Sequence, residues 1–257
     1  MRLDAYMVQN SLATGRDSAK ELISSEMVLV NKKVVTKPSF DITETDEVTL
    51  LLSETFVGRG AKKLKKALEV FMIDLGGKIA IDAGASTGGF TEVMLKNGAK
   101  KVYAVDVGKD QLAKSLREDE RVINLEKTDI RTLRIEDEAE FFTADVSFIS
   151  LTQILYPLYN LTSENATGVC LIKPQFEAGR KGIGKKGIVK DKKVHEEVLE
   201  KIISYSMSIG FSVAGLTHSP VTGGSGNIEY LIYLKKNGEN TDFNTKEVIL
   251  KAWEELK

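Results

Sequence analysis

The segment DAGASTGGF (residues 82–90) follows an apolar run and precedes a stretch with helical spacing, which predicts a loop between a strand and a helix. Its glycines, Gly84, Gly88 and Gly89, do not have the spacing of the dinucleotide-binding fingerprint. In parallel sheets, loops at the carboxyl ends of strands bind ligands. Asp82 ends this strand, and its carboxylate would repel a phosphate. The loop therefore favours a cationic or zwitterionic ligand.

Strand-like apolar runs alternate with helical patterns from residue 78 onward, which predicts a parallel sheet covered on both faces. The expected strands lie within residues 78–84, 101–108, 121–128, 141–149, 168–175, 211–219 and 227–236. The expected helices lie within residues 90–97, 109–118, 151–161 and 192–208. A loop without a helix joins the last two strands, so the final strand is expected to run antiparallel. This pattern predicts an α/β fold: the Rossmann-like, seven-stranded sheet of class I methyltransferases that use S-adenosylmethionine (SAM).

The N-terminal part of the chain has a different pattern of apolar and polar residues. It shows two short amphipathic helices, a hairpin that turns at Asn31-Lys32 and one more short strand, so residues 1–57 are expected to form a small α+β domain. Residues 58–77 are expected to form a basic connector and a first helix. Residues 78–257 would then form the larger domain.

Acidic residues are also expected at the ends of the next two strands. Asp106 can accept hydrogen bonds from ribose hydroxyls, as acids at this position do in NAD and SAM sites, and Asp129 is placed to meet an adenine amino group. With Asp82, these residues favour SAM over NAD. The predicted cofactor-binding residues are Asp82, Gly84, Ala85, Ser86, Thr87, Gly88, Asp106, Val107, Asp129 and Ile130.

Composition excludes several classes of protein. The net charge of −1 indicates that any nucleic-acid contact must be local. Cys170 is the single cysteine, so no internal disulfide can form, and His195 and His218 lack metal-ligand spacing. The sequence has neither a secretory pattern nor an apolar run of about 18 residues. We therefore expect a cytoplasmic protein, with a monomer favoured, that binds no metal and no membrane.

Four segments together resemble the TlyA family: RGAKKL (59–64), DVSFISL (145–151), LIKPQFEAGR (171–180) and GNIEYL (226–231). This family comprises ribosomal RNA ribose 2′-O-methyltransferases of the FtsJ type, often labelled hemolysins. Residues 2–35 resemble an S4 RNA-binding domain, so the resemblance spans essentially the whole chain. It implies SAM as cofactor and a cytidine ribose of ribosomal RNA as substrate.

The resemblance also implies a catalytic set of two lysines and two acids. By motif, the set falls on Lys63, Asp145, Lys173 and Glu229, with Lys62 left open as the alternative first lysine. A ribose 2′-hydroxyl is a poor nucleophile at neutral pH and needs a base within hydrogen-bond reach. A lysine can be that base where burial and a second cation favour its neutral form.

Basic residues indicate where RNA would bind. Residues 59–66 hold five basic side chains and no acid, and residues 173–193 hold eight against two acids. The predicted RNA contacts are Arg2, Arg16, Lys20, Lys32, Lys33, Arg59, Lys62, Arg180 and Lys185. The chain begins almost directly at RLDAY, and by resemblance this favours large-subunit RNA. A membrane-active hemolysin and an RNA-binding module without catalysis are the alternatives.

Overall fold

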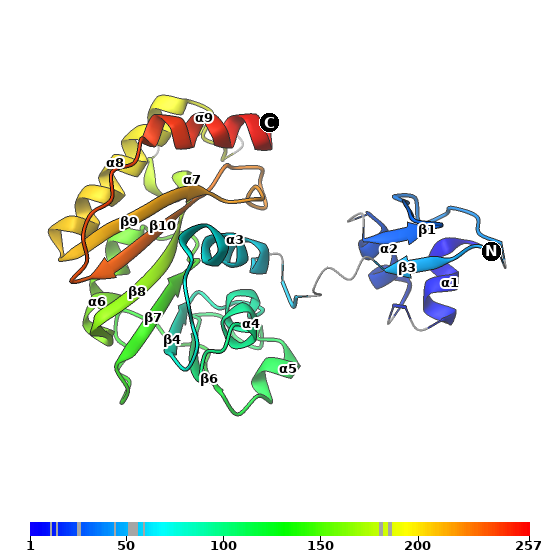
Figure 1. The fold of residues 1–257 in the computed structure, drawn as a ribbon, viewed down its shortest axis with the longest axis horizontal. Helices are drawn as coiled ribbons and strands as arrows, with labels where there is room; N and C mark the ends of the chain where they lie inside the picture. Colours follow the sequence, from blue (N-terminus) through cyan, green and yellow to red (C-terminus); the bar gives the residue numbers. More distant parts are fainter. Residues whose placement is uncertain are drawn as a thin grey trace. The chain divides into compact units, whose positions relative to one another are not determined.

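The chain divides into two compact units, Met1–Thr55 and Phe56–Lys257. The first boundary lies two residues before the expected one. The computed structural model describes residues 1–10, 12–13, 15–24, 27–43, 45–50, 56–58, 60–179, 182–184 and 187–257. Figure 1 shows the elements of each unit.

The small unit has the expected order of two helices followed by short strands. Its elements are α1 (Leu3–Gln9), α2 (Arg16–Ser24), β1 (Val28–Val30), β2 (Lys33–Val34) and β3 (Val48–Leu50). The strands pair antiparallel in the order β2-β1-β3. Asn31 and Lys32 have φ angles of 49° and 64°, the left-handed pair that a two-residue hairpin requires. The core includes Leu3 and Met7 of α1 and Ile23 of α2.

The larger unit contains a seven-stranded sheet within its described residues. Its strands are β4 (Ile79–Ala83), β5 (Lys101–Val105), β6 (Val122–Leu125), β7 (Ala139–Ala144), β8 (Thr162–Ile172), β9 (Phe211–His218) and β10 (Tyr230–Lys236). Their order is β6-β5-β4-β7-β8-β10-β9. β10 is antiparallel to both neighbours, and β4 to β8 are parallel. The predicted fold class is confirmed.

Helices cover both faces of this sheet (Figure 1). They are α3 (Ala61–Phe71), α4 (Gly89–Lys96), α5 (Lys114–Arg117), the 3₁₀ turn η1 (Leu151–Gln153), α6 (Leu155–Leu161), α7 (Pro174–Glu177), α8 (Lys192–Ser208) and α9 (Thr245–Leu256). Buried side chains of α3, α4 and α5 form one core cluster, and those of α6, α8 and α9 form the other.

Two helices differ from the sequence analysis. α5 begins at Lys114 rather than near residue 109, because the Glu126 carboxylate accepts the backbone N–H groups of residues 110–112 and holds them outside a helix. α9 was not expected from the sequence. Its Asn244 side chain caps the first turn by accepting two backbone N–H groups.

The sheet topology gathers the candidate site at one edge. The carboxyl ends of β4 to β8 meet there, as they must in a parallel sheet. Because β10 runs antiparallel to β8, Tyr230 pairs with Ile172, the last residue of β8. Lys173 and Glu229 therefore flank the same edge. In the described part of the chain, no helix is both long and apolar enough to cross a membrane.

Candidate active site

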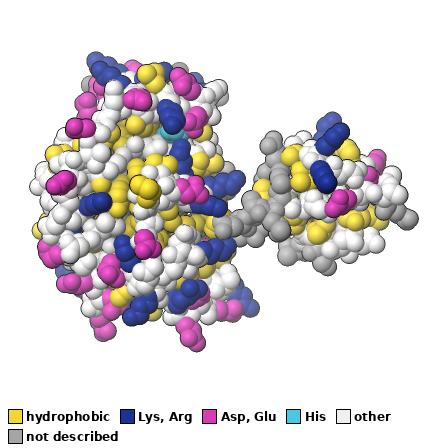
Figure 2. All heavy atoms as spheres, in the orientation of Figure 1, with side chains coloured by type: hydrophobic (Ala, Val, Ile, Leu, Met, Phe, Trp, Pro, Cys, Tyr) yellow, Lys and Arg dark blue, Asp and Glu magenta, His cyan; other side chains and the backbone are white. Residues whose placement is uncertain are grey.

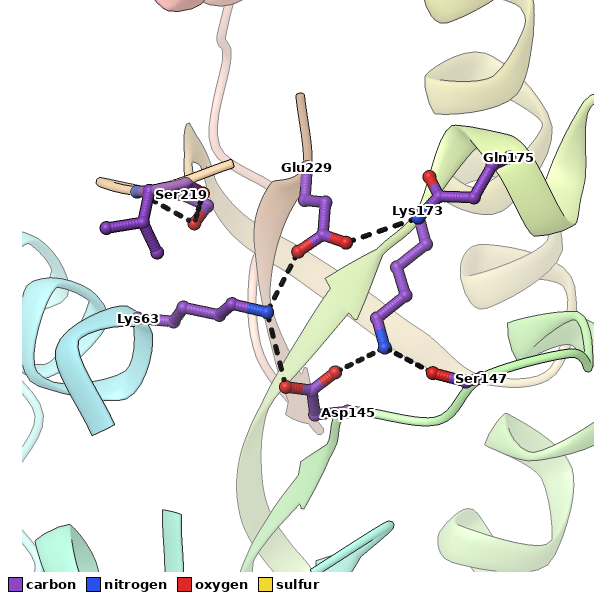
Figure 3. Close-up of polar contacts among 8 residues, drawn as sticks. Lys63, Asp145, Ser147, Lys173, Gln175, Ser219 and Glu229 are labelled. Atoms are coloured by element: carbon purple, nitrogen blue, oxygen red, sulfur yellow. Dashed lines mark hydrogen bonds and ion pairs between the residues drawn. The ribbon is translucent and has the colours of Figure 1, made fainter. Parts of the chain in front are cut away.

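The four residues of the predicted catalytic set meet in one cluster (Figure 3). Lys63 lies on α3, Asp145 directly follows β7, and Lys173 directly follows β8. Lys63 Nζ lies 2.8 Å from Glu229 Oε2 and 3.4 Å from Asp145 Oδ2. Lys173 Nζ lies 2.6 Å from Asp145 Oδ1. Asp145 thus contacts both lysines, and Lys63 contacts both acids.

The open choice between Lys62 and Lys63 is decided by the face of α3. Lys63 lies four residues before Ala67 on the buried side of the helix and is 8% exposed. Lys62 points to solvent. Of the two lysines, Lys63 is therefore the one that reaches the carboxylates.

Burial makes the pairing of these charges necessary. Glu229 is 2% exposed, and Lys173 is also buried. Besides Lys63, Glu229 has a second contact, because Gln175 Nε2 donates to its Oε1 over 3.3 Å. Two ammonium and two carboxylate groups balance in the cluster, and a buried ion that lost its partner would be strongly destabilising.

The glycine loop needs its glycine at position 84. Gly84 has a φ of +84°, and a Cβ there would lie 2.7 Å from the carbonyl oxygen of Asp145. The connector packs as closely, since a Cβ on Gly58 would lie 2.6 Å from Thr87 Oγ1. The loop that follows β4 is therefore fixed against the segments that carry Lys63 and Asp145.

Two adjoining cavities open at this edge. The first, of about 210 Å³, is lined by the glycine loop, Gly58, Gly60, Ser147 and Lys173 among others. The second, of about 450 Å³, extends over the ends of β5 and β6, and both cavities are lined by Gly84, Ser86, Asp145 and Ser147. Eight predicted cofactor residues line them: Gly84, Ala85, Ser86, Thr87, Asp106, Val107, Asp129 and Ile130.

Two of the acids that line the second cavity, Asp106 and Asp129, already hold hydrogen bonds. Asp106 accepts the backbone N–H groups of Ser86 and Gly108, at 2.8 and 2.7 Å. The Arg131 guanidinium donates to Asp129 and holds the pKa of that carboxyl below its ordinary value. Through its hydrogen bond from Ser86, Asp106 links the glycine loop to the end of β5.

Asp82 does not face the cofactor cavities, contrary to the expectation from the sequence that it binds the cofactor. Its side chain is fully buried and lines neither cavity. Thr91 Oγ1 and Thr143 Oγ1 donate to its two oxygens, over 2.7 and 2.8 Å. β4 ends at Ala83, one residue after Asp82, so the Asp82 side chain points under α4 rather than toward a ligand. Gly88 lines neither cavity either and packs against Leu112 and Leu116.

Replacing Asp82 with asparagine should change how stability depends on pH. Burial raises the pKa of the Asp82 carboxyl to about 6, from an ordinary 3.8. The folded protein then binds the proton more tightly than the unfolded chain, so wild-type stability falls as pH rises from about 4 to 6, by about 3 kcal/mol in all. Asparagine does not titrate. The stability of Asp82→Asn relative to wild type should therefore rise across that window, as measured by urea unfolding; a pH-independent difference would contradict the assignment.

The predicted RNA contacts fall into three groups. Arg16, Lys32, Lys33 and Lys62 are exposed. Arg2 and Lys20 have acidic partners within the small unit, Asp4 and Asp17. Arg59, Arg180 and Lys185 lie outside the described residues. Basic and acidic side chains are interspersed on the face of the larger unit seen in Figure 2.

Three residues that were not expected at the site from the sequence are brought there by the structure. Ser147 and Gln175 contact members of the catalytic set. Phe148 is 91% exposed, lines the second cavity and lies 5.0 Å from the ring of Phe176. Its φ of +64° is uncommon for a bulky residue and often marks a functional site. All three stand in the quoted DVSFISL and LIKPQFEAGR segments, two or three residues after the acid or the lysine.

Among the described residues, no group of three or more His, Cys, Asp and Glu side chains is arranged to hold a metal ion. His195 and His218 are both buried, and each has a protein partner. His195 contacts the Tyr230 hydroxyl and the Val189 carbonyl, and burial lowers its pKa to about 4.

Comparison with known proteins agrees with this geometry. The FtsJ-like methyltransferase family matches residues 56–236, and the S4 domain family matches residues 1–48. "Putative rRNA methyltransferase YqxC" of Bacillus subtilis is 46% identical, over 94% of this chain and 88% of that protein. "16S/23S rRNA (cytidine-2'-O)-methyltransferase TlyA" of Mycobacterium tuberculosis is 41% identical, over 91% of this chain and 89% of that protein.

A solved structure resembles the whole chain as well. A putative hemolysin from Streptococcus thermophilus is 42% identical, with a TM-score of 0.78, and the match covers 99% of this chain and 96% of that one. With its S4 domain and its FtsJ-like methyltransferase domain, this chain belongs to the TlyA family.

Proposed function

We propose that this protein transfers a methyl group from SAM to the 2′-oxygen of a cytidine ribose in ribosomal RNA. The observation that carries the proposal is the paired cluster of Lys63, Asp145, Lys173 and Glu229 beside the glycine loop. The cluster places a lysine that can take a hydroxyl proton next to a cavity that is suited to a nucleoside cofactor. Cytidine and ribosomal RNA come from the name of the M. tuberculosis relative.

The cavities fit SAM in chemistry and in size. The backbone of residues 84–87 comes close to the cavity because Gly84 carries no side chain, which suits the amino-acid end of the cofactor. The Asp106 carboxylate would accept the ribose hydroxyls, and Val107 and Ile130 would contact the adenine ring. Volumes of about 210 and 450 Å³ are of the order of cofactor sites, about 300–1,000 Å³. SAM supplies an activated methyl group on a sulfonium.

The cluster divides the chemical work between its members. Lys173 lines the first cavity and would receive the proton of the 2′-hydroxyl. Lys63 places a second cation near it, and Asp145 fixes both amines. Glu229 holds Lys63 from the other side. These contacts orient the reacting group before substrate binds, and such positioning lowers the barrier to transfer.

Replacing Asp106 with alanine should weaken SAM binding by about 1–3 kcal/mol, or roughly 5- to 150-fold. The change leaves the ribose hydroxyls unpaired and also releases the backbone of Ser86 and Gly108. Isothermal calorimetry measures the affinity. Asp110→Asn is the matched control, because Asp110 is exposed on the same loop and asparagine tolerates its φ of 54°. Equal affinities for wild type and Asp106→Ala would refute the ribose assignment.

Exposed cations of the small unit should contribute to RNA affinity. Lys32 and Lys33 stand at the hairpin turn, and each phosphate contact adds about 0.7–0.9 to the slope of log affinity against log salt. The double variant Lys32→Gln/Lys33→Gln should lower that slope by about 1.5 and weaken binding at low salt, as measured by fluorescence anisotropy with ribosomal RNA. Lys37→Gln is the control, because Lys37 is an exposed cation of the same unit and is not among the predicted RNA contacts. An unchanged slope would remove this turn from the RNA-binding surface.

One experiment tests the function against both alternatives. Purified protein is incubated with methyl-labelled SAM and with each ribosomal subunit, and the product RNA is mapped by mass spectrometry. We expect label on a cytidine 2′-oxygen, with large-subunit RNA as the favoured substrate. RNA binding without label would indicate an inactive binding module. Lysis of red cells without label on RNA would favour the hemolysin reading.

A further inference from the structure

Ser147 lies beside the amine of Lys173 (Figure 3). Lys173 Nζ donates a hydrogen bond to Ser147 Oγ over 2.9 Å. The contact of the same amine with Asp145 Oδ1 is shorter, at 2.6 Å, but Oδ1 is a buried acceptor without an aligned hydrogen bond. Asp145 therefore supplies charge at close range, whereas Ser147 supplies direction.

Direction matters because an amine base has a single lone pair. A neutral amine carries two N–H groups and one lone pair, so an acceptor that holds one N–H group restricts the directions in which the lone pair can point. Among the described residues, Ser147 Oγ is the oxygen that accepts such a hydrogen bond from Nζ, and Lys173 lines the first cavity. Without Ser147 the amine could rotate about its last C–N bond.

The Ser147 loop is held in place independently of Asp145. Glu177 lies on α7, which begins directly after Lys173, and its buried carboxylate accepts the Ser150 hydroxyl at 2.6 Å and the Leu151 N–H at 2.7 Å. Lys201 of α8 donates to the same carboxylate over 3.1 Å. The loop of Ser147 and the segment that follows Lys173 are thus tied together at a second point, which fixes the separation of the two side chains.

We propose that Ser147 is a positioning residue that directs the lone pair of Lys173 at the ribose 2′-hydroxyl. The inference rests on the proposed function. As the 2′-oxygen bonds to the methyl carbon, its proton passes to the Nζ lone pair and yields an ammonium group. The electron pair of the broken S–C bond stays on the sulfur of the donor. Ser147 accepts a hydrogen bond throughout and gives up no proton.

The test compares Ser147→Ala with Ser147→Thr, which keeps the accepting hydroxyl. Under single-turnover conditions with SAM and RNA saturating, Ser147→Ala should be about 10- to 100-fold slower than wild type, and Ser147→Thr within about threefold. SAM affinity, measured by calorimetry, should change by less than about twofold in both. The signal of the Lys173 amine in ¹⁵N-lysine NMR should shift in Ser147→Ala and stay in place in Ser147→Thr. Ser208→Ala, at the end of α8, is the control.

Each other outcome has a definite meaning. Wild-type rates in Ser147→Ala, with Lys173→Ala inactive, would overturn the inference and leave the proposed function standing. Wild-type rates in Lys173→Ala would show that the base lies elsewhere and would overturn the inference, whereas no transfer of label to RNA by the wild type would overturn the proposed function itself. A large loss of SAM affinity in Ser147→Ala, or a failure of threonine to restore the rate, would also overturn the inference, since the residue would then act on the cofactor or on packing.

Discussion

Replacing Lys173 with alanine is expected to slow methyl transfer by about 10²- to 10⁴-fold, the usual contribution of a general base. SAM affinity should change little, because the lysine acts on the nucleophile rather than on the donor. The fold should persist, because Asp145 keeps Lys63 as a partner at 3.4 Å. Single-turnover transfer of label to ribosomal RNA measures the rate, and calorimetry measures the affinity.

An arginine at position 173 distinguishes the role of Lys173 as a base from its role as a positive charge. Lys173→Arg keeps a cation beside Asp145 but cannot release its proton at working pH, so it should be as inactive as alanine. Lys100→Ala, at an exposed position before β5, is the matched control and should behave as wild type. An active arginine variant would show that position 173 contributes charge and that the base lies elsewhere.

The second large effect is expected at Lys63, in stability as well as in rate. Lys63→Ala leaves Glu229 buried, with Gln175 as its remaining neutral partner. Removing one partner of a buried ion pair usually costs about 3–5 kcal/mol of unfolding free energy. Urea unfolding should show that loss, and methyl transfer should fall with it.

Lys62→Ala is the control for this experiment. Lys62 is the neighbouring lysine, points to solvent and should change stability by no more than about 0.5 kcal/mol. The double variant Lys63→Ala/Glu229→Ala should regain much of the stability, because no unpaired charge stays buried, and should remain inactive. A stable, active Lys63→Ala would contradict the assigned role.

The fold was largely predictable from local patterns. Apolar runs with helical stretches between them indicate a parallel sheet, and the loop without a helix near residues 219–226 indicates the reversed last strand. These signals are strong because the periods of strand and helix differ. Asn31 and Lys32 likewise mark their hairpin turn. α9 was not identified, and the start of α5 depends on hydrogen bonds from the distant Glu126.

Strand-end acids show the limit of such patterns. Asp82, Asp106 and Asp129 follow one rule in the sequence, but only the last two line a cavity. Asp82 still belongs to β4, and strand alternation turns its side chain toward Thr91 of α4. A one-residue difference in where the strand ends decides whether a carboxylate meets a ligand or is buried.

By itself, the sequence determined the two-domain organisation, the class of sheet, the glycine loop and the family. Tertiary structure decided which charges meet: Lys63 is separated from Asp145 by 82 residues and from Glu229 by 166. It also decided between Lys62 and Lys63 and brought Ser147 to the amine of Lys173. The physical reason is that a buried charge is stable only beside its partner, and the pairing of β10 with β8 places those partners at one sheet edge.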